Sequence, residues 1–175
     1  MTTIATDGKV IAADTMTTRP GGFREPGHYK KMHVVDGPGG VRWLIAVAGD
    51  MSMVEPLKRW VVDGATAADI PFRDDRHADW HLWVFKPEGL FEAMASAPRL
   101  CPCHCPNAIG SGARFAIGAF AMGATPRQAV EVASRFDIYT GGEVEVLDIA
   151  DVLGLPKTRT SSDVTPLTPK IRAAE

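Results

Sequence analysis

The segment from Val41 to Ala48 restricts the possible folds more than any other part of this 175-residue chain. It reads Val-Arg-Trp-Leu-Ile-Ala-Val-Ala, an almost continuous apolar run of the length of one β-strand. A strand with one face in water would alternate apolar and polar residues instead. We therefore expect this strand to be covered on both faces, which requires a domain with several layers.

Shorter β-prone runs and amphipathic segments flank this strand on both sides. Asp7-Gly8 separates the first two runs and is a strong β-hairpin signal. The Gly- and Pro-rich segment 15–28 predicts a loop. The expected strands cover 3–6, 10–13, 29–35, 41–48, 80–85, 90–94 and 144–146, and the expected helices cover 52–63, 113–122 and 125–135. Runs of strands with segregated helices favour an α+β layered domain over a parallel βαβ sheet.

Composition narrows the class of protein. The chain is 45% hydrophobic and 23% charged, as is ordinary for one soluble domain, and its net charge of −2 gives no reason to expect nucleic acid or an anionic membrane. No apolar run approaches the roughly 18–20 residues that span a bilayer. The Asp7-Gly8 turn also interrupts the N-terminus too early for a signal peptide. We therefore expect a cytoplasmic protein with no nucleic-acid or membrane partner.

Met1-Thr2 is the first feature that suggests chemistry. Threonine is small enough for methionine aminopeptidase to remove Met1, which would leave Thr2 with a free α-amine. That amine has a reference pKa of about 7.7–8.0, so a good fraction is neutral near pH 7 and can act as a base for the Thr2 hydroxyl. The alternative is that Met-Thr is a common start without consequence, and two residues alone favour that alternative.

Cys101, Cys103 and Cys105 lie within five residues, with His104 between the last two. Alternate cysteines in extended chain share one face, which would suit zinc or a redox role. However, structural zinc sites use pairs spaced Cys-x₂₋₄-Cys with a second, distant pair, and the sequence has no such pair. We expect reduced thiols in a loop that bind no metal.

Several short motifs in a fixed order resemble those of the N-terminal-nucleophile (Ntn) hydrolases. The similarity is to the proteasome β-subunit branch and most of all to the HslV peptidases. The motifs are Thr2-Thr3-Ile4, Ala12-Ala13-Asp14, Lys30-Lys31, Ala48-Gly49, Ile109-Gly110-Ser111-Gly112 and Ile138-Tyr139-Thr140. The resemblance implies a four-layer αββα sandwich. It extends from Thr2 to Leu147, so we expect a peptidase domain over 1–148 and a loosely ordered extension over 149–175.

The resemblance also implies a role for each of five residues. Thr2 matches the nucleophile, and Lys31 matches a lysine whose ammonium lowers the pKa of the Thr2 amine. Asp14 matches the aspartate that pairs with this lysine. Gly49 matches the glycine whose N–H stabilises the oxyanion, and Ser111 matches a serine that relays the proton of the amine. Taken singly, Asp14 could be a turn residue, Lys31 half of a solvated Lys-Lys pair and Ser111 a helix cap.

Substrate selection is a further expectation from the same alignment. Val47, two residues before the expected oxyanion glycine, would line the pocket with Thr18 and Met51. An apolar pocket predicts cleavage after residues such as leucine. Asp50 replaces the second glycine usual in the family, and a carboxylate turned into the pocket would favour basic residues instead.

The resemblance also concerns cations, partners and alternative functions. Backbone carbonyls of Ser134, Asp137 and Thr140 could hold a structural monovalent cation or Mg²⁺, while the chemistry itself needs no cofactor. A homo-oligomeric ring or double ring, fed with protein substrates by an ATP-dependent unfoldase, is implied. A non-catalytic assembly protein and an amidohydrolase acting on small amides are the alternative functions. Segment 65–79 is short and polar where HslV has a second long helix. In the family this region helps to build the ring and faces the partner ATPase, so the resemblance leaves the identity of the partner open.

Overall fold

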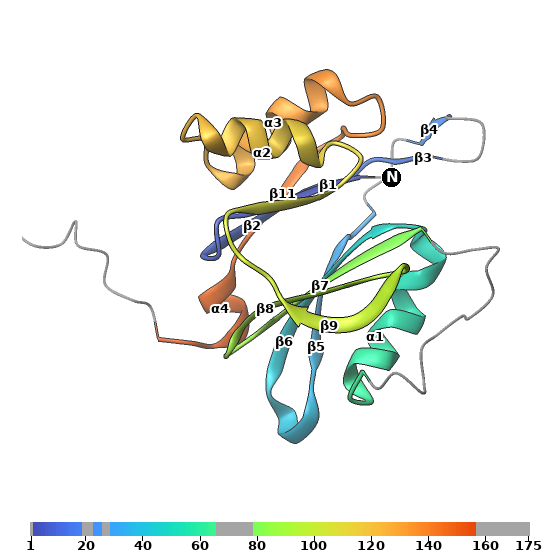
Figure 1. Cartoon of the computed structure of the whole chain (residues 1–175), viewed down its shortest axis with the longest axis vertical. Helices are drawn as coiled ribbons and strands as arrows, with labels where there is room; N and C mark the ends of the chain where they lie inside the picture. Colours follow the sequence, from blue (N-terminus) through green and yellow to red (C-terminus); the bar gives the residue numbers. More distant parts are fainter. Residues whose placement is uncertain (1, 19–22, 26–28, 66–78, 157–175) are drawn as a thin grey trace, which may run out of the picture.

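Two antiparallel sheets stacked face to face form the centre of the molecule, as Figure 1 shows. The computed structural model describes residues 2–18, 23–25, 29–65 and 79–156. The first sheet has the strand order β10-β1-β2-β11. Its strands are β1 (Thr3–Thr6), β2 (Val10–Asp14), β10 (Asn107–Gly110) and β11 (Val144–Asp148).

The second sheet follows the chain order β5-β6-β7-β8-β9. Its strands are β5 (Met32–Asp36), β6 (Arg42–Gly49), β7 (Trp80–Lys86), β8 (Gly89–Met94) and β9 (Ala97–Pro102). A 3₁₀ turn, η1 (Pro38–Gly40), connects β5 to β6, and another, η2 (Met51–Met53), precedes helix α1.

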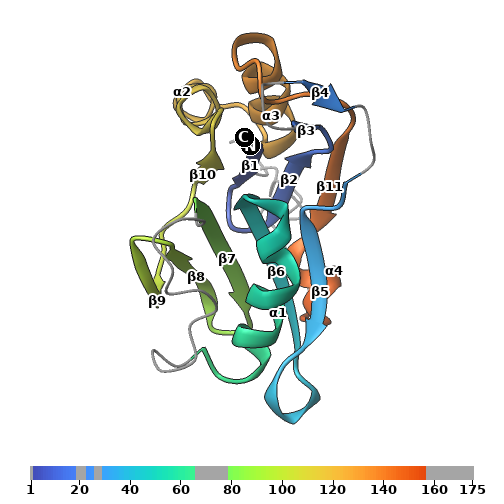
Figure 2. The same ribbon diagram turned by 90° about the vertical axis from the view of Figure 1, so that its right-hand side faces the viewer.

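Helices cover the outer faces of both sheets, which confirms the expected αββα sandwich. Helices α2 (Ala113–Ala121) and α3 (Pro126–Phe136) lie on the four-stranded sheet, and α1 (Val54–Val62) lies on the five-stranded sheet (Figures 1 and 2). Helix α3 begins with the capping box predicted from Thr125 to Gln128. No helix of the described residues is long and apolar enough to cross a membrane.

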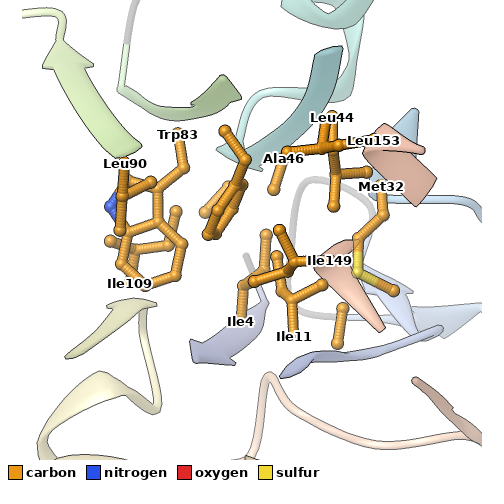
Figure 3. Close-up of a cluster of buried hydrophobic side chains, with 13 residues drawn as sticks. Ile4, Ile11, Met32, Leu44, Ala46, Trp83, Leu90, Ile109, Ile149 and Leu153 are labelled. Atoms are coloured by element: carbon orange, nitrogen blue, oxygen red, sulfur yellow. The ribbon is translucent and has the colours of Figure 1, made fainter. Parts of the chain in front are cut away.

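The main core lies between the two sheets (Figure 3). Ile4 and Ile11 of the first sheet meet Leu44 and Trp83 of the second, and all four are completely buried. Alternate residues of β6 pack on the other side, where Ile45 and Val47 contact the α1 layer. The prediction that this strand is covered on both faces is therefore confirmed.

Three parts of the structure differ from expectation. β9 was not among the expected strands, and the cysteine segment from Cys101 was expected in a loop; as the edge strand of its sheet, β9 tolerates Pro98 and Pro102. Within the expected loop 15–28, the strands β3 (Thr17–Thr18) and β4 (Arg24–Glu25) pair with each other.

The chain also stays packed beyond the expected domain boundary at residue 148. Helix α4 (Ile149–Leu153) follows β11 directly, and Ile149 and Leu153 are buried in the core between the sheets. Residues 149–156 are thus part of the domain rather than an extension, because this short helix supplies apolar side chains to the core. Segments 66–78 and 157–175 lie outside the described residues.

Candidate active site

Thr2 lies at the end of a central strand and is only 2% exposed. β1 runs between β10 and β2, and its register pairs Ile4 with Ala13. This register brings Asp14, at the end of β2, beside the start of β1. On the other side, Gly110 has a φ of +96°, and a Cβ there would lie 2.0 Å from the Thr2 carbonyl oxygen. Only glycine permits that approach without strain.

Asp14 is the centre of the hydrogen-bond network around Thr2. Its Oδ1 accepts hydrogen bonds from the Thr2 hydroxyl, from the Thr3 N–H at 2.8 Å and from Lys31 Nζ at 2.7 Å. Its other oxygen, Oδ2, accepts the Gly141 N–H at 3.0 Å. Asp14 is 1% exposed, so these bonds replace almost all of its hydration. A surface turn residue would not be held in this way.

Lys31 forms a buried ion pair with Asp14. Its side chain is 1% exposed, and Nζ also donates to the Met16 carbonyl at 2.7 Å. Burial lowers the pKa of Lys31 from its ordinary value of 10.5, while attraction to Asp14 and the hydrogen bond between them act in the opposite direction. The alternative for Lys31 was one half of a solvated Lys-Lys pair, and its burial rules that alternative out.

Ser111 joins Thr2 to a second carboxylate. Its hydroxyl lies 3.3 Å from the Thr2 carbonyl oxygen and donates to Asp137 Oδ2 at 2.6 Å. The same Asp137 oxygen accepts the Thr140 hydroxyl at 2.6 Å, and Thr140 Oγ1 lies 2.6 Å from Thr3 Oγ1. Ser111 and Thr140 thus both donate hydrogen bonds to the buried carboxylate of Asp137, and Thr140 links it to Thr3.

The side chain of Asp137 is the member of this site that sequence reasoning missed. Only its carbonyl was considered there, as a cation ligand. The signal was local: Asp137 follows α3 directly and its Oδ1 accepts the N–H of Tyr139, two residues on, at 3.2 Å. An aspartate at such a turn commonly bonds its own backbone. That pattern predicts the turn, but it does not predict that the second oxygen faces Ser111.

Gly49 ends β6 beside a cleft of about 250 Å³. Its φ is +111°, and a Cβ would lie 2.0 Å from the Asp79 carbonyl oxygen, so a larger residue could not occupy this position without strain. The described residues that line the cleft are Ala48, Gly49, Asp79, His81, Gly110 and Ser111. The cleft therefore opens where the ends of β6 and β10 meet, next to the network around Thr2.

The structure does not bring Val47 to this cleft. Val47 is completely buried and packs against α1, because successive residues of a strand point to opposite faces and Ala48 faces the other sheet. Met51 packs against the same α1 cluster. The carboxylate of Asp50 caps η2 by accepting the Ser52 N–H at 2.9 Å, and Thr18 pairs with Arg24 in the small sheet.

The proposed cation ligands lie around the end of α3. Ser134 is in the last turns of the helix, and the Asp137 carbonyl accepts the Thr140 N–H at 3.1 Å. That bond leaves one lone pair of the carbonyl for a cation, so the cation remains a prediction. Elsewhere, no group of three or more His, Cys, Asp or Glu side chains in the described part of the chain is arranged to hold a metal ion.

The cysteines lie at the edge of the five-stranded sheet, where Cys101 is opposite Glu92. Cys101 belongs to β9 and not to a loop, while Cys103 and Cys105 lie in the connection to β10. All three are free thiols. Burial raises the pKa of Cys103 to about 11, and burial also raises that of Cys105. Thiols with raised pKa values are poor nucleophiles and poor metal ligands at neutral pH.

Solved structures with a similar architecture include chains from two organisms. Thiobacillus denitrificans BPH is 23% identical, with a TM-score of 0.59 over 85% of this chain and 97% of BPH. BPH in complex with epoxomicin gives 22% identity and a TM-score of 0.60 over 85% and 99%. Eukaryotic HslV from Trypanosoma brucei gives 19% identity and a TM-score of 0.57 over 84% and 98%. No protein-family model matches the sequence, and no curated protein matches it.

These similarities establish the fold. The chain has the αββα sandwich of HslV and the proteasome subunits, and the resemblance found in its sequence motifs is confirmed at this level. The similarity spans 97–99% of each solved chain.

Proposed function

We propose that the protein is a threonine peptidase of the HslV type, with Thr2 as its N-terminal nucleophile once Met1 has been removed. The observation that carries the proposal is the convergence of the Thr2 hydroxyl and Lys31 Nζ on one oxygen of Asp14. This buried ionic group lies beside a cleft with the expected oxyanion glycine, in a fold shared with HslV. A purely structural role would not need a buried lysine, which is costly to desolvate.

In the proposed reaction the Thr2 α-amine is the base. A carboxylate is a weaker base than an α-amine, and Asp14 Oδ1 is already held by the Lys31 ammonium and the Thr3 N–H, so we assign it the orientation of the hydroxyl and not the removal of its proton. The amine takes that proton while Thr2 Oγ1 bonds to the scissile carbonyl carbon. The Gly49 N–H stabilises the resulting oxyanion. The positive charge of the Lys31 ammonium disfavours a second positive charge on the Thr2 amine, so the amine stays neutral and can act as a base.

Collapse of the tetrahedral intermediate breaks the C–N bond and leaves an ester on Thr2. The amine gives its proton to the departing nitrogen, so the first product leaves as a neutral amine. Water then attacks the ester carbonyl carbon while the Thr2 amine takes one of its protons. The ester C–O bond breaks, the amine returns that proton to Thr2 Oγ1, and the carboxylic acid product is released. Ser111, which Asp137 holds 3.3 Å from the Thr2 carbonyl oxygen, is the proposed relay for the proton of the amine.

The assembly is part of the same proposal. We expect a ring or double ring of identical subunits in the cytoplasm, which receives unfolded protein from an ATP-dependent partner. A structural cation at the end of α3 would stabilise the loop that carries Asp137 and Thr140. None of the chemical steps above depends on the cation or on the partner.

N-terminal processing is the decisive test. The purified protein should have an intact mass lighter by one methionine residue, cleave fluorogenic peptides and form an epoxomicin adduct on its N-terminal peptide. The matched control inserts glutamate between Met1 and Thr2. Methionine is then retained and Thr2 has no free amine, while its side chain is unchanged. Equal peptidase activity in the two proteins would disprove the mechanism.

A further inference from the structure

The cleft beside Gly49 has only two titratable side chains among the described residues that line it, Asp79 and His81. The remaining described lining consists of small residues at the ends of β6 and β10. With a volume of about 250 Å³, the cleft is smaller than typical pockets for whole ligands and suits a single side chain. Its two titratable residues therefore decide which side chain is favoured.

His81 faces the cleft because of the register of the sheet. It lies directly opposite Ala48 on β6, and Ala48 packs in the core between the sheets, so both residues are on the inner face. Its Nε2 lies 3.2 Å from Oε2 of Glu92. Glu92 is opposite Trp83, two residues along β7, and is therefore on the same face.

The cleft carries negative charge in either protonation state of His81. When His81 is neutral, the carboxylates of Asp79 and Glu92 give two negative charges; when it is protonated, one negative charge remains. Asp137 adds a further carboxylate behind Ser111. Lys31, the buried cation of the Thr2 site, is paired with Asp14. An anionic side chain would lose hydration here and meet charges of its own sign.

Asp79 is also held in place. Its carbonyl accepts the Asp50 N–H at 3.0 Å, and its backbone closes over Gly49, where no Cβ fits. Because Trp80 packs in the α1 layer and successive residues of an extended chain alternate, Asp79 is on the same inner face as His81, where it lines the cleft. The Asp50 carboxylate, in contrast, is directed to the start of η2.

We propose that this cleft is a substrate subsite for a cationic side chain, with Asp79 as its principal specificity residue and the His81–Glu92 pair as its second wall. The inference deepens the proposed peptidase function and rests on it for the identity of the ligand as a peptide. It replaces Val47, Met51 and Asp50 as the residues that select the substrate. Arginine or lysine next to the scissile bond is expected, and glutamate is excluded.

The test compares cleavage and binding. In a peptide library varied on both sides of the scissile bond, wild-type protein should prefer arginine over leucine by roughly three- to tenfold in kcat/KM. Asp79→Asn should remove that preference by lowering kcat/KM for the arginine peptide several-fold more than for the leucine peptide. Asp79→Lys should reverse it in favour of glutamate. Asp63→Asn, an exposed carboxylate at the end of α1, is the matched control and should behave as wild type.

Binding to the Thr2→Ala variant separates the two proposals, because it does not require catalysis. A blocked arginine tripeptide amide should shift the amide resonances of Asp79 and His81 and bind more tightly than its leucine analogue. Cleavage without an arginine preference, or a preference that follows Asp50→Asn instead of Asp79→Asn, would overturn the subsite. If the wild type is inactive yet the arginine peptide binds at Asp79, the subsite holds and the peptidase proposal fails. No difference between the arginine and leucine peptides in binding would overturn the subsite by itself.

Discussion

The group around Thr2 and the segment from Cys101 to Cys105 both gather reactive side chains, but their environments are opposite. Thr2, Asp14 and Lys31 are at most 2% exposed and converge on one carboxylate oxygen. The thiols lie at an edge strand and its connection, where Cys105 is exposed and Cys103 is half-buried. One region holds charges out of water in fixed geometry, and the other holds neutral groups near the surface.

The comparison shows that residue type alone does not make a reactive site. A thiol is a better intrinsic nucleophile than a hydroxyl, yet burial raises the pKa of Cys103 to about 11 and keeps it protonated. The Thr2 hydroxyl gains its reactivity from what surrounds it: a fixed carboxylate, a buried lysine and, after processing, an adjacent amine. Four experiments test this difference between the two regions.

Thr2→Ala should have the largest effect. It removes the nucleophile and should lower peptidase kcat by about a thousandfold or more, while the loss of one hydrogen bond to Asp14 costs about 1 kcal/mol of folding stability. Activity on a fluorogenic peptide and the thermal midpoint measure the two effects. Thr2→Ser keeps a hydroxyl and should retain part of the activity. Wild-type rates in the alanine variant would mean that another residue is the nucleophile.

Lys31→Met should be nearly as severe for activity and more severe for stability. The methionine has a similar volume, but it leaves Asp14 buried without its cation, which typically costs about 3–5 kcal/mol. Urea unfolding measures the stability, and peptide cleavage by the fraction that remains folded measures the chemistry. Lys30→Met, at the exposed neighbour, is the matched control and should change neither. A stable, active Lys31→Met protein would show that the ion pair is dispensable.

The pH profile should show a moderate effect. Because burial lowers the pKa of Lys31, its ammonium is lost at a pH below 10.5, and kcat/KM should fall on the alkaline side within that range. Between the lowered pKa and 10.5, the unfolded chain binds more protons at this lysine, so this group makes the folded state more stable as pH rises. Unfolding of the protein therefore does not explain the fall, which circular dichroism at each pH can verify. Undiminished activity up to pH 10.5 would contradict a role for the charged lysine.

Cys103→Ser should have the smallest effect. Asn107 Nδ2 lies 3.1 Å from the Cys103 sulfur, and a serine oxygen can accept that hydrogen bond. Activity should change less than about twofold and stability by about 1 kcal/mol or less. Slow alkylation of Cys103 by iodoacetamide at pH 8, compared with a free thiol, would confirm that its pKa is raised. A large loss of activity would show that the segment 101–105 contributes to catalysis after all.

Local patterns predicted most of the secondary structure, because they depend on interactions between near neighbours. The hairpin at Asp7-Gly8, the buried strand 41–48 and the capping box at Thr125 were all predicted in this way. β9 was missed since its prolines are acceptable only at a sheet edge, and edge position is a property of the whole sheet. Helix α4 was missed because five residues carry too little periodicity to be recognised.

The sequence pattern determined an α+β layered domain, and the resemblance carried by its motifs implied the αββα class and selected the residues to examine, which are Thr2, Asp14, Lys31, Gly49 and Ser111. Only the tertiary structure decided which side chains meet. The carboxylate of Asp137 reaches Ser111 from 26 residues away, and Val47 turns from the cleft while Asp79 and His81 line it. The geometry of a strand fixes only that successive side chains point to opposite faces of the sheet. Which face meets the other sheet depends on how two sheets stack, and that is decided by contacts between residues far apart in the chain.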